Sequence, residues 1–326
     1  MTKIDEYLLN TSEDVPIIKS SLENVNSLLK IGGYPQNTII GLYGPSGGAK
    51  SIFCWQEAFF FLKQSDKNVL YLGTEGGEEL YPQLWFGRWK ERFGLDAKDL
   101  SRIYVLSIRD IQKILALHGY NIRINRHFSG KSELLTTGIN YIKRTQEPLK
   151  GEYVSEIENF IIDKNIGMII VDSITNPIDL ELAGGGYLDF PTRAGIISKW
   201  LNSLHKICTR LNTLIITVHH HSFKPAAQPD LATLKDVPKI KGGEIVEYNL
   251  KIVMYLHNSP LGSDEEVPML SELRRMYLVR FFDEPKWMRS VPLMINDTGI
   301  FDISEDELKE IRKSAEETKH RRKLMR

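Results

Sequence analysis

The chain has 326 residues, 42% of them apolar and 26% charged, so it can bury the core of one large domain or of two small ones. Lysine plus arginine and aspartate plus glutamate each number 42, so the net charge is zero and a nucleic-acid surface would have to be a local patch. No uninterrupted apolar run approaches the roughly 20 residues that span a bilayer, and the two cysteines are too few for a disulfide framework, so we expect a cytoplasmic protein with no membrane partner.

Short apolar runs alternate with helical stretches up to about residue 220. In chain order, the predicted elements are the strand NTIIGLY (37–43), a helix over 51–63, the strands NVLYLGTE (68–75) and RIYVLSI (102–108), a helix near 154–164, the strand GMIIVDS (167–173), a helix near 192–211 and the strand TLIITVHH (213–220). Apolar strands that alternate with helices predict an α/β fold, in which a mostly parallel central sheet has helices on both faces.

The pattern changes after residue 220, where three apolar runs follow one another with no helix between them. They are YNLKIVMYL (248–256), RRMYLVRFF (274–282) and SVPLMIND (290–297), and we expect them at one edge of the sheet in antiparallel arrangement. Ser304 with Glu307 three residues later forms a capping-box pattern, which predicts a charged helix within 303–326. We therefore divide the chain into an N-terminal segment (1–20), a core (21–302) with an insertion at about 110–151, and this C-terminal helix.

The stretch GLYGPSGGAKS (41–51) nearly matches a phosphate-binding loop, which requires glycine, any four residues, glycine, lysine, then serine or threonine. Lys50 is expected to reach the β- and γ-phosphates of ATP, and the Ser51 hydroxyl to ligate Mg²⁺. Ala49 replaces the second glycine; if this position needs a positive φ, alanine costs about 1–2 kcal/mol there, which weakens the motif without abolishing it. The alternative is a plain glycine-rich turn. The expected nucleotide-binding residues are Gly44, Pro45, Ser46, Gly47, Gly48, Ala49, Lys50, Ser51 and Ile52.

Two carboxylates follow apolar strands and should lie at the same edge of the sheet as the loop. Asp172 ends GMIIVDS, where it could hold Mg²⁺ through water, although it could also simply cap the next loop. Glu75 ends NVLYLGTE, where it could orient or deprotonate the water that attacks the γ-phosphate. Three independent signals at strand ends therefore predict an Mg-ATP site.

Eight segments occur in the order seen in one known family: GPSGGAKS, YLGTEGG, IIVDSIT, ELAGGGYLDFPTRAG, IITVHH, KIKGGEIVEYN, FFDEP and INDTGIFD. Over roughly residues 20–302, the chain resembles the core of the archaeal RadA and eukaryotic recombinases, within the wider RecA-like ATPases. The resemblance implies a RecA-like P-loop NTPase core and assigns Lys50, Glu75 and Asp172 the roles given above. His219 best matches the side chain that senses the γ-phosphate, with His220 as the alternative register. Asp283 and Pro285 match a segment that covers ATP bound to the neighbouring subunit.

The chain also departs from that family in ways that affect DNA binding. Only about twenty residues precede the core, so we expect no helix–hairpin–helix domain, and GGG (184–186) lacks the arginine of the first DNA loop. We expect weak, salt-sensitive binding of single-stranded DNA through Lys224, Lys235, Lys239 and Lys241. The insertion is either a solvated helical excursion or a nucleic-acid or partner surface. It holds the basic side chains Arg123, Arg126, His127, Lys131, Lys143, Arg144 and Lys150.

The function predicted from these features is that of an Mg-ATP-dependent accessory factor, a RadA paralogue, in homologous recombination and DNA repair. A KaiC-like regulatory ATPase or kinase that acts on a protein without DNA is one alternative, and a non-hydrolysing subunit, inactivated by Ala49, is another. HHH (219–221) is not expected to bind a metal, because consecutive side chains of a strand point to opposite faces. Residues 1–22 contain no phenylalanine for docking on a neighbour, so we expect monomers or small oligomers that join a recombinase or paralogue partner.

Overall fold

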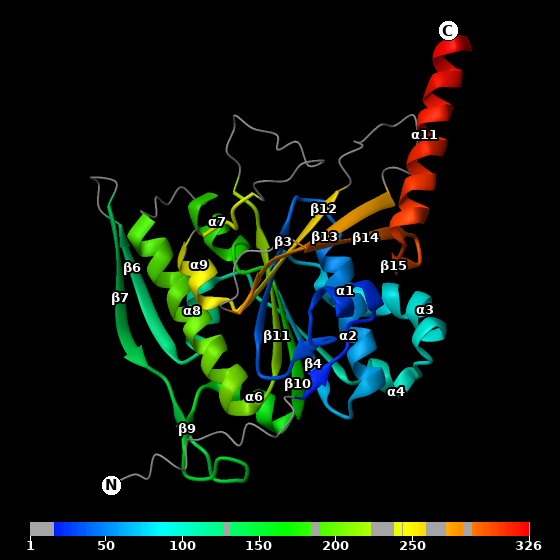
Figure 1. Cartoon of the computed structure of the whole chain (residues 1–326). Helices are drawn as coiled ribbons and strands as arrows, with labels where there is room; N and C mark the ends of the chain where they lie inside the picture. Colours follow the sequence, from blue (N-terminus) through cyan, green and yellow to red (C-terminus); the bar gives the residue numbers. More distant parts are fainter. Residues whose placement is uncertain are drawn as a thin grey trace.

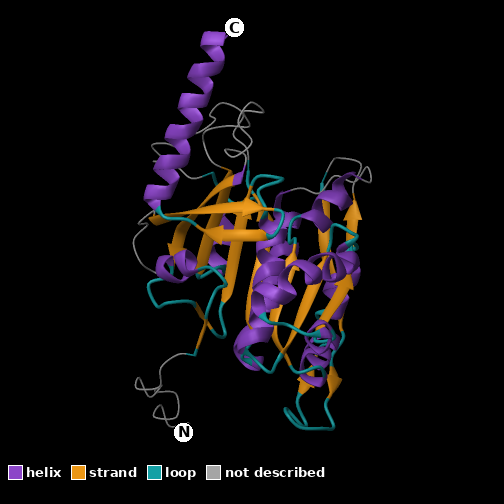
Figure 2. Ribbon diagram, turned by 90° about the vertical axis from the view of Figure 1, so that its right-hand side faces the viewer, coloured by secondary structure: helices purple, strands orange, loops and turns teal. Residues whose placement is uncertain are grey.

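The computed structural model of the chain describes residues 16–126, 131–183, 190–222, 238–242, 244–258, 272–282 and 289–325. A nine-stranded sheet runs through the molecule. Its strands are β3 (Ile39–Gly44), β4 (Asn68–Gly73), β5 (Ile103–Ser107), β10 (Ile166–Asp172), β11 (Leu214–His220), β12 (Ile252–Asn258), β13 (Leu273–Phe281), β14 (Arg289–Asn296) and β15 (Gly299–Asp302). They are arranged in the order β15-β14-β13-β12-β3-β11-β10-β4-β5. Figures 1 and 2 show the sheet among the helices in two views.

The strands from β12 to β5 are parallel to one another, and β13, β14 and β15 extend the sheet in antiparallel fashion. This arrangement confirms the predicted mostly parallel sheet with antiparallel strands near the C-terminus. The expectation was wrong for β12, which pairs parallel with β3 on one side and antiparallel with β13 on the other. The chain pattern after residue 220 gives no sign of this, because strand direction depends on where the preceding segment crosses the sheet.

Helices cover both faces of the sheet (Figure 1). On the face that we call the α2 face lie α1 (Glu23–Leu28), α2 (Lys50–Gln64), α3 (Tyr81–Phe93) and α4 (Ala97–Leu100). On the opposite face, called the α8 face, lie α5 (Ile111–Leu117), α6 (Glu156–Asp163), α7 (Asn176–Ala183), α8 (Phe190–Leu211) and α9 (Glu244–Asn249).

Each central strand contributes to both apolar cores, because successive side chains of a strand point to opposite faces. In β3, Ile40 and Leu42 pack on the α2 face, whereas Ile39 and Tyr43 pack on the α8 face. Both cysteines, Cys54 and Cys208, are buried as small core residues, as expected. This alternation decides which polar side chains at the strand ends can meet.

The insertion is mainly a β-hairpin, so the prediction of a helical excursion was wrong beyond α5. Strands β6 (Tyr120–Arg126) and β7 (Ser132–Ile139) pair antiparallel, followed by the short strands β8 (Ile142–Lys143) and β9 (Tyr153–Val154). The run YNIRINR alternates apolar and polar residues with the period of two that is typical of a strand. This alternation predicts β6, whereas the basic residues of the insertion give no information about its secondary structure.

Buried hydrogen bonds attach the insertion to α8. His118, 1% exposed, accepts a hydrogen bond at Nε2 from Trp200 Nε1 (3.1 Å), and its Nδ1 lies 2.9 Å from Ser203 Oγ. Among the basic side chains named above for the insertion, Arg144 is buried and forms an ion pair with Asp163 at 3.0 Å. That residue is therefore structural and does not belong to a basic surface.

The C-terminal helix α11 (Glu305–Met325) projects from the body of the molecule (Figure 1). Its capping box is confirmed: the N–H of Ser304 donates to Glu307 Oε2 (2.6 Å), and the N–H of Glu307 donates to Ser304 Oγ (3.0 Å). Leu308 packs with Leu273 and Ile303 in a small separate cluster. The first turns of the helix are thus anchored to β13 and to the segment after β15.

Helix α2 binds both ends of the core through a set of hydrogen bonds that we call the α2 clamp. Gln56 Nε2 donates to Ser21 Oγ (2.9 Å) and to the carbonyl of Ile300 (3.0 Å). Buried Glu57 accepts from the Ser21 N–H (3.0 Å) and hydroxyl (2.5 Å). Asp302 accepts from the backbone N–H groups of Glu23 and Asn24. Burial raises the pKa of Glu57 to about 7, although the hydrogen bonds from Ser21 oppose the shift.

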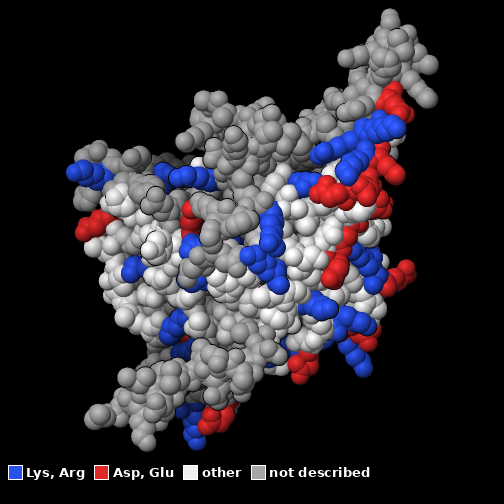
Figure 3. Space-filling view, in the orientation of Figure 1, with Lys and Arg blue, Asp and Glu red and all other residues white. Residues whose placement is uncertain are grey.

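The short strands β1 (Ile17–Ile18) and β2 (Tyr34–Pro35) pair beside this clamp. Across the face seen in Figure 3, basic and acidic side chains are interspersed, in keeping with the zero net charge. Within the described ranges, no helix is both long enough and apolar enough to cross a membrane.

Candidate functional site

The predicted phosphate-binding loop connects β3 to α2, in the order of strand, loop and helix that such a motif requires. Gly44 has no room for a side chain, because a Cβ there would lie 2.1 Å from the carbonyl oxygen of Leu256. Ala49 has φ 71° and ψ 18°, in the left-handed region, so the position does need a positive φ. Alanine is tolerated there at a cost of about 1–2 kcal/mol, which the surrounding fold must offset. The loop therefore has the backbone of the motif despite its substitution.

Lys50 is the first residue of α2, and its side chain folds back over the loop. Its Nζ donates to the carbonyls of Gly44 (3.1 Å) and Pro45 (2.7 Å). Burial lowers the pKa of Lys50, while the nearby carboxylates of Asp172 and Glu75 raise it. Two neutral carbonyls are weaker partners for an ammonium than a phosphate would be, so the amine can exchange them for an anionic ligand.

Asp172 ends β10 and lies on the α2 face, because Met168 and Ile170 of the same strand pack there and side chains alternate. Tyr71 of β4 donates its hydroxyl to Asp172 Oδ2 at 2.7 Å. Burial raises the pKa of Asp172, and hydrogen bonds from Ser51 and Tyr71 oppose that shift. The Ser51 hydroxyl and the Asp172 carboxylate are thus neighbours, as the predicted magnesium site requires.

Glu75 follows the end of β4 in a loop held by the buried carboxylate of Glu78. The backbone N–H groups of Glu75 and Gly76 each donate to Glu78 Oε1 at 2.6 Å, and Ser107 Oγ donates to Oε2 at 3.1 Å. The Glu75 carboxylate is half exposed, and its Oε1 lies 3.6 Å from His220 Nε2. Interaction with His220 is the largest cause that holds the pKa of Glu75 below its usual value.

The two consecutive histidines of β11 lie on opposite faces. His219 is fully buried on the α8 face, where its Nε2 lies 2.9 Å from Thr217 Oγ1, and burial lowers its pKa to about 3. The structure therefore brings His220, the alternative register, to Glu75 and keeps His219 away from it. Sequence reasoning also missed Tyr71 and Glu78, although the acidic run TEGGEE was a visible sign of Glu78.

Several predicted residues lie outside the described part of the chain: Asp283, Pro285, the glycines of GGG, Lys224 and Lys235. Of the expected DNA-contacting lysines, Lys239 and Lys241 are described, and Lys241 pairs with Asp179 at 2.7 Å. Within the described residues, no group of three or more His, Cys, Asp or Glu side chains is placed to hold a metal ion. A magnesium ion at Ser51 and Asp172 would take its remaining ligands from phosphate oxygens and water, which is the usual habit of that ion.

The mostly parallel sheet, the helices on both faces and the antiparallel edge define a RecA-like fold. Among solved structures, the crystal structure of the RadB recombinase is similar, with a TM-score of 0.54 over 87% of this chain and 98% of that chain. Its sequence identity with this chain is 19%, so the likeness concerns the fold. No protein-family model matches the sequence. No curated protein matches it either.

Proposed function

We propose that this protein binds Mg-ATP at the loop between β3 and α2 and hydrolyses it slowly. The observation that carries the proposal is that Lys50, Asp172 and the Glu75–His220 pair meet at one edge of the sheet, although they come from different strand ends. The attraction of both carboxylates for the Lys50 ammonium is part of the same arrangement. Perturbed titratable groups that converge at the carboxyl ends of parallel strands are typical of a ligand site in an open α/β sheet.

Each side chain has a separate role in this proposal. Lys50 exchanges its two carbonyl partners for the β- and γ-phosphates, and the loop amides point toward the same anion. Ser51 and Asp172 would hold Mg²⁺, which neutralises developing charge on the phosphates when bound. Glu75 orients or deprotonates the attacking water. His220, rather than His219, connects Glu75 to the end of β11 and would respond to the γ-phosphate.

We further propose that the ATPase is an accessory factor in homologous recombination, which interacts with single-stranded DNA and with a recombinase or paralogue partner. The support is the order of the eight family-like segments and a fold similar to that of a protein named as a recombinase. In the KaiC-like alternative, a protein partner replaces DNA, and turnover is independent of single-stranded DNA.

The decisive test is the rate of ATP hydrolysis with and without single-stranded DNA for three proteins: wild type, Lys50→Ala and Lys63→Ala. Lys63 is an exposed lysine in the last turn of α2, so its variant controls for the loss of a positive charge on the same helix. We expect slow, magnesium-dependent turnover that DNA stimulates, that Lys63→Ala retains and that Lys50→Ala loses.

Each other outcome has a definite meaning. Unchanged turnover in Lys50→Ala would reject the phosphate-loop site. Tight ATP binding in the wild type without turnover would identify the non-hydrolysing alternative. Regular filaments of the purified chain on DNA, seen by electron microscopy with ATP, would make it a recombinase in its own right and reject the accessory role.

A further inference from the structure

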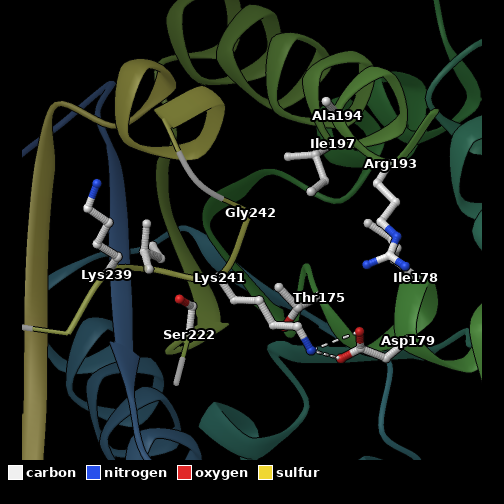
Figure 4. Close-up of a pocket in the computed structure, with 11 residues that line it drawn as sticks. Thr175, Ile178, Asp179, Arg193, Ala194, Ile197, Ser222, Lys239, Lys241 and Gly242 are labelled. Atoms are coloured by element: carbon white, nitrogen blue, oxygen red, sulfur yellow. Dashed lines mark hydrogen bonds and ion pairs between the residues drawn. The ribbon is translucent and has the colours of Figure 1, made fainter. Parts of the chain in front are cut away.

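A cavity of about 280 Å³ lies on the α8 face, next to the ends of β10 and β11 but separate from the phosphate loop (Figure 4). Its walls come from α7, α8, the segment 238–242, Thr175 and Ser222, and they combine an aliphatic part, including Ile178, Ile197 and Ile240, with polar and charged side chains. Its volume is at the lower end of the roughly 300–1,000 Å³ of small-molecule sites. The cavity therefore suits a compact ligand with an apolar body.

A buried polar atom in the lining has no partner. Thr175 is 2% exposed, lines the cavity, and its Oγ1 has no hydrogen-bond partner within the described part of the protein. An unsatisfied buried hydroxyl costs about 1–3 kcal/mol, and buried polar groups are paired in the great majority of cases. A ligand with a polar group could satisfy this hydroxyl, which makes the cavity more than a packing defect.

The charged side chains of the lining favour an anion. Arg193, Lys239 and Lys241 are basic, and Asp179 is the acidic residue among them. Lys241 Nζ lies 2.7 Å from Asp179 Oδ2, and both side chains are partly exposed (42% and 34%) at one end of the cavity (Figure 4). Figure 4 shows Arg193 and Lys241 on the same side of the cavity as Asp179, so an anion beside Lys241 would lie near two basic side chains.

We propose that this cavity binds a small organic anion, with its apolar body between Ile178 and Ile197 and a carboxylate or phosphate group beside Lys241. Thr175 contributes its hydroxyl as the second polar contact. Aliphatic walls with a few placed polar groups are the usual composition of such a site, in which the apolar part supplies affinity and the polar part orientation.

Two residues that line the cavity are connected through the backbone to residues of the candidate ATP site. Thr175 lies three residues beyond Asp172, in a segment that Thr74 holds by its hydroxyl: Ser173 N–H donates to Thr74 Oγ1 at 2.8 Å. The N–H of Lys241 donates to the carbonyl of His220 at 2.8 Å. A ligand bound in the cavity should therefore affect the positions of Asp172 and His220 through this backbone. This coupling rests on the proposed ATPase function, whereas binding of the anion does not.

The test uses the full chain without nucleotide, titrated by calorimetry with hexanoate and hexyl phosphate as anions, 1-hexanol as the neutral control and hexylamine as the cationic control. We expect saturable one-to-one binding of at least one anion, about tenfold tighter than 1-hexanol or hexylamine, because a charge-assisted hydrogen bond adds roughly that factor. The tighter of the two anions identifies the head group as carboxylate or phosphate.

Three variants locate the bound anion. Ala194→Phe, which fills the cavity from α8, should abolish binding; Lys241→Met should weaken it about tenfold; Thr175→Val, which keeps the shape of the side chain, should weaken it by a few-fold. Lys90→Met, a lysine on the exposed side of α3, is the matched control and should have no effect. Far-ultraviolet circular dichroism checks that each variant is folded.

Binding of both hexanoate and hexyl phosphate no tighter than that of 1-hexanol, or anion binding that survives both Lys241→Met and Ala194→Phe, would overturn the proposal. If Ala194→Phe does not fold, Lys241→Met decides alone. The coupling is tested by repeating the titration with Mg-ADP bound: we expect the Kd of the anion to change about threefold or more, and an unchanged Kd would show that the cavity is independent of the nucleotide. Failure of anion binding would leave the ATPase proposal untouched.

Discussion

The two faces of the central sheet both bury ionisable groups, but in opposite ways. On the α2 face, Lys50, Asp172 and Glu57 are surrounded by hydrogen-bonding or charged partners. On the α8 face, burial lowers the pKa of His118 to about 4 and that of His219 to about 3, so these rings are neutral at neutral pH. The buried ionisable groups named here on the α2 face thus have charged or hydrogen-bonding partners, whereas the two buried histidines of the α8 face are neutral, and β11 supplies one histidine to each face.

The largest expected effect comes from a substitution of Glu75, which lies near Lys50 in the candidate ATP site. Glu75→Gln should lower ATP hydrolysis by about 10²–10⁴-fold and leave ATP affinity nearly unchanged, because only the transition state needs the base. Single-turnover hydrolysis and equilibrium binding of a fluorescent ATP analogue measure the two effects separately. Glu79→Gln, an exposed carboxylate four residues away, is the control. Simultaneous loss of binding and hydrolysis would make Glu75 a structural residue.

The two histidines of β11 provide a paired test. His220→Ala should slow hydrolysis about tenfold and change the free energy of unfolding by less than about 0.5 kcal/mol, since the side chain is partly exposed. His219→Ala should do the reverse and destabilise the fold by about 1–3 kcal/mol, because it leaves a cavity and removes the hydrogen bond between His219 and Thr217. Denaturant unfolding and steady-state turnover distinguish them. A larger loss of turnover in His219→Ala would restore His219 as the sensor.

The two histidines also show which features of the candidate site cannot be predicted from the sequence. Residue types and strand ends predict the phosphate loop, Asp172 and Glu75, because each is marked by an apolar run that ends in a glycine or a carboxylate. The choice between His219 and His220 depends on which face α2 covers, and a single sequence does not reveal that. The buried Glu57 was missed for a related reason, because its partner Ser21 is distant in the chain. The β6–β7 hairpin differs, because its strands are close in the chain and the alternation in YNIRINR predicts a strand.

The two faces should respond to acid in opposite directions. The pKa of His118 is about 4 in the folded protein and about 6.5 when unfolded, so its contribution to stability is lost as the pH falls below about 6.5. Glu57 has a folded pKa of about 7, above the unfolded value of about 4.5, so stability is gained as the pH falls over the same range. Each of these two effects amounts to about 2 kcal/mol between pH 7 and 5, with opposite signs, and the lowered pKa of His219 acts in the same direction as that of His118.

Single substitutions separate these contributions. Compared with the wild type, His118→Gln should lose less stability between pH 7 and pH 5. Glu57→Gln should lose more stability than the wild type over the same range. Guanidinium unfolding at both values gives the free energies. If both variants keep the pH dependence of the wild type, the prediction that His118 and Glu57 make opposite contributions to stability is wrong.

The smallest expected effect concerns Ala49. Ala49→Gly removes the cost of a left-handed alanine, about 1–2 kcal/mol, and adds the entropy cost of glycine, about 0.5–1 kcal/mol, so the net stabilisation should be about 0.5–1 kcal/mol. The matched control is Ala116→Gly within helix α5, which should destabilise by about 1 kcal/mol. Thermal unfolding measures both. Destabilisation by Ala49→Gly would show that the loop is not strained at that position.

The α2 clamp has a mechanical consequence. Glu23 and Asp302 are separated by 279 positions in the chain, yet the N–H of one donates to the carboxylate of the other at 2.7 Å. Tension applied between the two ends of the core would pass through this contact and through Gln56, which spans Ser21 and Ile300. Most of the closed loop of chain between them would be bypassed while the clamp held, because the contacts of the clamp join its two ends directly. A partner that pulled on α11 would therefore strain the clamp before it disturbed the candidate ATP site.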